Sequence, residues 1–211
     1  MRSAHPMPGN PWPHDMMLAI EDSSDQLMTL LWVREAWGLE VRGANLPPLL
    51  VDSPEPVDPA VRDRAPLAEW AYYWPELWEG ALEHAGQERR PPSFERLQAS
   101  ADGSEERRAA LLTLLGPTWQ DRFGNDALEQ GYHAWRSTRS ERDAGSRPMF
   151  VDHERANLDV VVPAWEAGLT TIIVLPCVGD VAARIGEHGL FMTETTRADT
   201  ASYRRAIALF N

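Results

Sequence analysis

The most reactive side chains of this sequence gather in its last third, each after a short apolar run typical of a buried strand. In chain order they are Asp152, His153, Cys177, Asp180, Glu194 and Arg197. Parallel strands bring their carboxyl ends to one edge of a sheet, where ligands of α/β proteins gather. The pattern therefore predicts a shared site at that edge, although ordinary loop and capping residues would give the same pattern.

Cys177 is the only cysteine of the chain, so an internal disulfide is excluded. As a nucleophile it would need a helix N-terminus to lower its pKa, with His153 or His188 as the base and Asp152 as the orienting group. A free cysteine is more often a small buried apolar residue. No cysteine signature of a known kind surrounds it, so burial is the favoured prediction.

The run Asp152-His153-Glu154 offers three side chains that bind metals, but it lacks the i, i+4 histidine pair that places two ligands on one helical face. Dinucleotide-binding and Walker glycine loops and the G-x-S-x-G elbow do not occur in the sequence. We therefore expect neither a metal nor a cofactor. Whether the chain is an enzyme stays open at this stage.

The elements that would position these residues form a small α/β unit over residues 148–211. Strands are predicted at 149–151, 170–175 and 190–193, and helices at 154–167, 181–187 and from Thr196, capped in a box with Asp199, to near Phe210. This βαβαβα order favours a parallel sheet, because residues 176–189 are just long enough for a right-handed crossover. An antiparallel pairing of the last two strands remains the alternative.

Residues 1–147 are predicted to be mainly helical. The predicted helices span residues 24–37 with a Ser23/Gln26 capping box, 66–86, 93–100, 104–115, and 125 to about 140. Pro75 leaves open whether 66–86 is one kinked helix or two. The proline-rich residues 45–66 predict a non-helical strap, residues 137–147 end in a loop, and residues 1–22 form an arm that wraps the domain or a neighbour.

Tryptophan is abundant, with nine residues in the chain. Trp70, Trp74 and Trp78 recur at i, i+4 and i+8, so they share one helical face. Such a stripe usually packs in a core. The alternative is a binding surface, because tryptophan is enriched at the energetic centres of protein interfaces.

The composition is that of a folded globular protein. The chain has 211 residues, 43% hydrophobic and 25% charged, which fits one compact domain over residues 1–211. The fold class predicted is α+β or α/β, with the helical two-thirds packed on the small C-terminal sheet unit. No stretch approaches 18 apolar residues, so no membrane span is expected.

The formal net charge is −12, which disfavours nucleic acid as a partner. All 20 basic residues are arginine, a bias that indicates a GC-rich bacterial genome rather than a binding site. The apolar core of a signal peptide is missing near Met1, so the cytoplasm is the expected location.

Three functions fit these features. The leading hypothesis is a noncatalytic, acidic, tryptophan-bearing module that binds a protein partner, such as an immunity or regulatory protein. The alternative is a small-molecule binder or hydrolase-type enzyme that uses the strand-end loops around Asp152, Cys177 and Glu194. A third is a homo-oligomeric subunit that exchanges its arm and strap with a neighbour.

Overall fold

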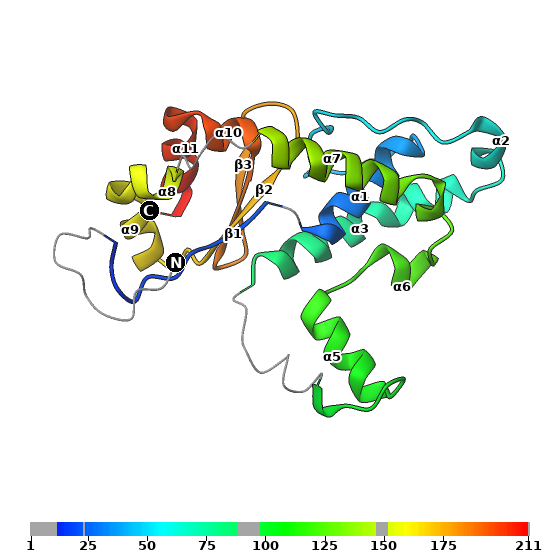
Figure 1. Ribbon diagram of the computed structural model, residues 1–211, viewed down its shortest axis with the longest axis horizontal. Coiled ribbons are helices and arrows are strands. Elements are labelled where there is room, and N and C mark those ends of the chain that lie inside the picture. Colours follow the sequence, from blue (N-terminus) through cyan, green and yellow to red (C-terminus); the bar gives the residue numbers. More distant parts are fainter. Residues whose placement is uncertain (1–11, 23, 88–97, 147–151, 211) are drawn as a thin grey trace.

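The computed structural model describes residues 12–22, 24–87, 98–146 and 152–210, and it has an α+β fold (Figure 1). Among these residues, four strands form one mixed sheet in the order β1-β2-β4-β3. The strands are β1 (Ala19–Glu21), β2 (Thr171–Leu175), β3 (Ala182–Ile185) and β4 (Gly189–Thr193). β1, β2 and β4 are parallel, and β3 is antiparallel to β4.

The prediction of strands at 170–175 and 190–193 is confirmed, and so is their parallel pairing. The helix predicted at 181–187 is wrong, because these residues form β3 and the turn into β4. Ile185 joins the core and the left-handed Gly186 (φ 54°) reverses the chain, so tertiary pairing overrides the helical preference of the Ala-Ala-Arg run. The crossover between β2 and β4 therefore passes through an edge strand instead of a helix.

β1 comes from the segment predicted to be an arm. It pairs with β2 of its own chain, and the preceding Met16 and Leu18 are buried. Residues 16–21 thus belong to the sheet unit of the same chain. The strand predicted at 149–151 lies outside the described residues.

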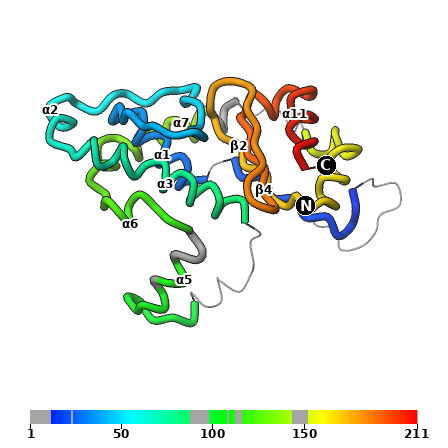
Figure 2. Tube along the Cα trace, turned by 180° about the vertical axis from the view of Figure 1, so that it is seen from behind, coloured from blue at the N-terminus to red at the C-terminus, as the bar shows by residue number. Residues whose placement is uncertain are grey.

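The sheet lies between two groups of helices, as the view from behind also shows (Figure 2). Ile173 and Phe191 face the core that contains α1 (Asp25–Ala36) and α3 (Leu67–Ala85). The intervening residues of the same strands, including Ile172 and Leu190, face the opposite core, which residues of α9 (Leu158–Glu166) and α11 (Thr200–Ile207) complete. This alternation follows from the two-residue period of a strand and explains why β2 and β4 are buried on both faces.

The helices that follow the predicted pattern are α1, α3 and α5 (Glu105–Leu115). Gly38 adopts the left-handed conformation (φ 58°) just beyond α1, which is common for a glycine that follows a helix. α3 is one continuous helix that contains Pro75, which resolves the alternative in favour of a single element. Ser23 and most of the helix predicted at 93–100 lie outside the described residues.

Other helix boundaries differ from the predictions. The strap contains a one-turn helix, α2 (Pro59–Arg62), because Asp58 caps it and Pro59 takes the first position. The helix expected from 125 is instead a 3₁₀ turn, η1 (Leu128–Gln130), followed by α7 (Tyr132–Ser146), and the preceding helix α6 (Trp119–Phe123) was not predicted. Gly131 (φ 114°) separates η1 from α7, and the loop predicted within 137–147 is wrong because α7 continues to Ser146.

The C-terminal helices are divided in the same way. Residues 154–167 form α8 (His153–Ala156) and α9 (Leu158–Glu166), which Asn157 separates. The last segment forms α10 (Glu194–Ala198), α11 (Thr200–Ile207) and η2 (Ala208–Phe210). The predicted Thr196/Asp199 capping box is wrong, because Thr193 caps α10 and Asp199 caps α11. Within the described ranges, no helix has the length and apolar character needed to cross a membrane.

The tryptophan stripe of α3 is buried. Trp70, Trp74 and Trp78 retain 6%, 0% and 3% of their surface, and the rings of Trp74 and Trp78 stack with centroids 5.4 Å apart. Trp74 Nε1 donates to the Leu30 carbonyl at 2.8 Å, so α1 and α3 are joined inside the core. These three side chains therefore do not form an exposed binding surface, and the core interpretation of the stripe is confirmed.

Candidate functional site

The proline-rich strap meets the loop after β2 at the carboxyl edge of the sheet. Leu50 and Cys177 face each other in an antiparallel bridge. Val51 N donates to the Pro176 carbonyl at 2.9 Å, and Val178 N donates to the Leu49 carbonyl at 2.8 Å. Side chains alternate across such a bridge, so Leu50 and Cys177 point inward while their neighbours point outward.

The outward side chains form a small apolar surface. Leu49 and Val51 each keep 56% of their surface exposed, and Val178 keeps 45%. Leu49 lies directly opposite Val178, and Val51 follows Leu49 on the same face of the strap. We call Leu49, Val51 and Val178 the apolar patch. Isolated exposed apolar residues are common on proteins, but three gathered on one face from distant segments resemble a binding surface.

A buried ion pair in α1 fixes the strap beneath this patch. Arg34 and Glu35 have side chains that are 8% and 7% exposed and lie 3.0 Å apart. Arg34 donates to the carbonyls of Pro47 and Pro48, each at 2.7 Å. Glu35 accepts from Leu50 N at 2.7 Å and from the Ser53 hydroxyl at 3.0 Å. The strap, which has little secondary structure of its own, is therefore held by charge-assisted hydrogen bonds.

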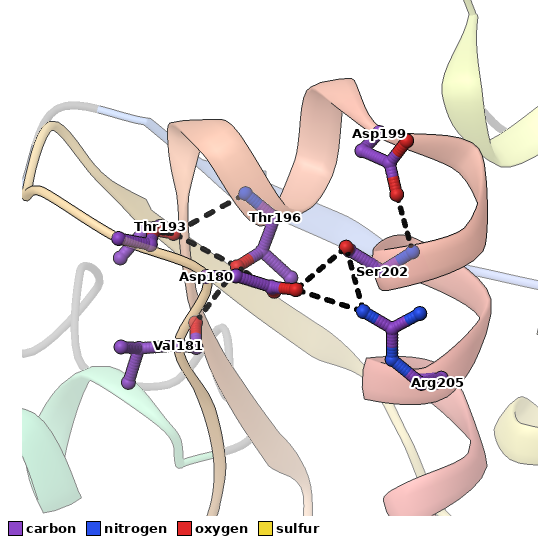
Figure 3. A network of polar contacts seen from close by, with 8 residues as sticks. Asp180, Val181, Thr193, Thr196, Asp199, Ser202 and Arg205 are labelled. Carbon is purple, nitrogen blue, oxygen red and sulfur yellow. Dashed lines mark hydrogen bonds and ion pairs between the residues drawn. The ribbon is translucent and has the colours of Figure 1, made fainter.

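A polar network fixes the other side of the patch, the loop that carries Val178 (Figure 3). The carboxylate of Asp180 accepts from Thr196 Oγ1 at 2.9 Å, from Ser202 Oγ at 2.7 Å and from Arg205 Nη2 at 2.8 Å. Thr193 Oγ1 donates to the Gly179 carbonyl at 2.7 Å. These bonds hold the loop against α10 and α11, and those from the Ser202 and Thr196 hydroxyls lower the pKa of Asp180.

α7 adds a third support. The Arg139 side chain is 8% exposed and lies 2.9 Å from Glu194 of α10 and 3.5 Å from Asp52 of the strap. Arg142 lies 3.1 Å from the same Asp52 carboxylate. α7 is thereby joined to both the strap and the first turn of α10. The strap, the sheet edge and α7 form one connected framework around the patch.

Cys177 lies in the core beneath this framework and is fully buried. Desolvation raises the pKa of its thiol to about 12, against a smaller opposing effect of Arg34. A nucleophilic cysteine needs the opposite shift, toward an accessible thiolate. The location of Cys177 matches the buried, unreactive alternative.

Asp152, His153 and Arg197 lie in a different cluster. Asp152 caps α8 by accepting from Arg155 N at 2.9 Å, and the His153 ring lies 6.5 Å from that of Tyr203. Arg197 forms a bidentate pair with the buried Glu154, both Nη2 distances being 3.0 Å. Burial, followed by the charge of Glu154, raises the pKa of Tyr203.

The six predicted site residues therefore divide among four sets of contacts. Cys177 is in the core, Asp180 is in the network of Figure 3, Glu194 pairs with Arg139, and the remaining three belong to the α8 cluster. The part of the chain that the structure describes contains no group of three or more side chains arranged to hold a metal ion.

The apolar patch was not among the predicted sites. The available signal was the run Leu49-Leu50-Val51, which is apolar on both faces within a polar, proline-rich strap. The run itself does not show which residues face the interior, because the segment that pairs with it, at 176–178, is far away in sequence. Comparison with known proteins adds no functional guide, because no protein-family model, curated protein or solved structure matches this chain.

Removing Glu35 tests the role of the buried ion pair. Glu35→Ala leaves Arg34 buried without its counter-charge, so we expect a loss of about 3 kcal/mol in the free energy of unfolding, measured in urea. The matched control is Asp159→Ala, which breaks an ion pair with Arg204 whose side chains are 64% and 40% exposed. That change is expected to cost much less than the loss of Glu35, because solvent screens exposed ion pairs. Equal losses for the two variants would contradict the structural role of Glu35.

Thiol labelling tests the state of Cys177. At pH 8 a thiol with a pKa of about 12 is almost entirely protonated, so we expect the native protein to react with a disulfide reagent roughly a thousandfold more slowly than the urea-unfolded chain. Labelling of the native protein at the rate of the unfolded chain would show an accessible thiolate and restore Cys177 as a candidate nucleophile.

Proposed function

We propose that this protein is a noncatalytic protein-binding module and that the apolar patch is its docking surface. The observation that carries the proposal is the exposure of Leu49, Val51 and Val178 on two segments that are hydrogen-bonded to each other. About half of each side chain is exposed, so full coverage by a partner contributes roughly 1 kcal/mol for each of them.

The framework beneath the patch supports this proposal. Binding normally costs conformational entropy when loops and side chains become ordered. Here Arg34, Glu35 and Asp180 already fix the two segments that carry the patch. A partner therefore binds a surface that is already ordered, so the entropic cost of ordering these segments subtracts less from the binding free energy.

The enzyme alternative has weaker support. Catalysis at the strand-end loops would require Asp152, Cys177 and Glu194 to act on one substrate, whereas Asp152 caps a helix, Cys177 is buried and Glu194 pairs with Arg139. The hypothesis of an acidic immunity or regulatory protein remains the specific form of the proposal. A single unpaired cysteine suits the reducing cytoplasm of a bacterium, which is the location we propose.

A binding comparison between three immobilised proteins tests this function. The wild type, a Leu49→Asp/Val178→Asp variant and a Tyr72→Asp control are exposed to lysate of the source organism. Tyr72 is 76% exposed on α3 and lies outside the patch. We expect at least one protein to be retained by the wild type and the control and to be reduced at least about tenfold on the patch variant, because buried charge opposes docking. Identical retention on all three proteins would contradict the proposal.

A further inference from the structure

The charge of the chain restricts what covers the apolar patch. The sequence has 32 acidic and 20 basic residues, which gives the net charge of −12. Long-range fields of this size accelerate encounters with molecules of opposite charge and oppose encounters with molecules of the same charge. A second copy of this chain would bring another −12 to the interface. The global charge thus disfavours self-association through the patch.

Two partly exposed carboxylates lie close in sequence to residues of the patch. Asp52 follows Val51 directly, and Asp180 lies two residues beyond Val178. Their side chains are 48% and 46% exposed, so each carboxylate is partly open to solvent. Since a carboxylate has about four acceptor sites, each can accept further hydrogen bonds from a cationic partner.

Neighbouring guanidinium groups fix the direction of both carboxylates. Asp52 is held by Arg139 and Arg142, and Asp180 is held by Arg205. Arg142 and Arg205 are themselves 57% and 66% exposed, so each partly exposed carboxylate has an exposed guanidinium group beside it. Ordered polar groups of this kind are typical of the polar part of a protein interface.

We propose that the occupant of the patch is a folded protein of net positive charge. It covers Leu49 and Val178 with aliphatic side chains and presents Lys or Arg to Asp52 and Asp180. This inference rests on the proposed function and adds the chemical class of the partner. The fixed carboxylates determine how a basic surface is oriented on the patch, and the net charge of the whole chain increases the rate at which that surface associates.

Site-specific photo-cross-linking tests the identity of the occupant. The full chain carries p-benzoylphenylalanine at one position, as Leu49→p-benzoylphenylalanine or Val51→p-benzoylphenylalanine, and is irradiated in lysate of the source organism. Tyr72→p-benzoylphenylalanine is the matched control at an exposed position outside the patch. Thermal melting of each variant checks that the fold is intact. Because two patch positions are used, the test does not depend on either variant alone.

The expected result is a protein that cross-links from position 49 or 51 but not from position 72, and that binds a cation exchanger at pH 7. With the purified pair, we expect the dissociation constant to rise about tenfold between 50 and 300 mM salt, since screening weakens attraction between exposed charges. An acidic partner, or binding that salt leaves unchanged, would overturn this inference while the protein-binding function stands. A cross-linked dimer of the chain would do the same. No product specific to positions 49 and 51 would overturn both proposals.

Discussion

The structure depends on the buried ion pair of Arg34 and Glu35. Burying two charges is costly unless their hydrogen-bonding groups find partners. Here the partners are supplied by the strap: two proline carbonyls for Arg34, and the Leu50 amide and the Ser53 hydroxyl for Glu35. The strap thus satisfies most hydrogen-bonding groups of the pair, although the buried Arg34 Nε has no hydrogen-bond partner among the described residues. The Arg34 guanidinium also lies over the ring of Trp74, 5.4 Å from its centroid, so α1, α3 and the strap meet at this pair.

This constraint extends from the helical half to the sheet. Once Leu50 is fixed against Glu35, its side chain packs beside Cys177 and the strap bridges the loop after β2. The same geometry turns Leu49, Val51 and Val178 toward solvent. The apolar patch is thus a direct consequence of how the strap is anchored. That link between a buried pair and an exposed surface is the basis for a binding role, whereas the chemically reactive side chains serve as caps, ion pairs and core.

Sequence patterns predicted an element correctly where the periodicity of its own residues determines its structure. The apolar run of β2 and the tryptophan stripe of α3 depend on local periodicity, and both were predicted correctly. β1 and β3 could not be found in this way, since three or four residues carry little periodic signal and are strands only because β2 and β4 lie beside them. α7 was cut short for a related reason, because the Arg139 contacts that hold its polar second half come from Asp52 and Glu194.

The candidate site illustrates the same limit. The rule that ligands gather at the carboxyl ends of parallel strands pointed to the sheet edge near residues 176–180, where Val178 of the apolar patch lies. It did not identify the residues that matter there, because the strap segment opposite them lies more than one hundred positions earlier in the chain. Pairing across that separation is a tertiary property. Reactive side chains stand out in a sequence, but here Asp152 caps a helix, Cys177 is buried in the core, and Asp180, Glu194 and Arg197 form ion pairs within the fold.

The most direct test of this account is amide hydrogen exchange of the strap in the native protein. A proline-rich connector without anchors would exchange at nearly the rate of an unstructured peptide. The Leu50 amide donates to Glu35, and the Val51 and Val178 amides donate across the bridge, so we expect all three to be protected by at least about a hundredfold. Protection at this level would support a preformed surface held by the buried ion pair. Exchange of these three amides at the unstructured rate would contradict it.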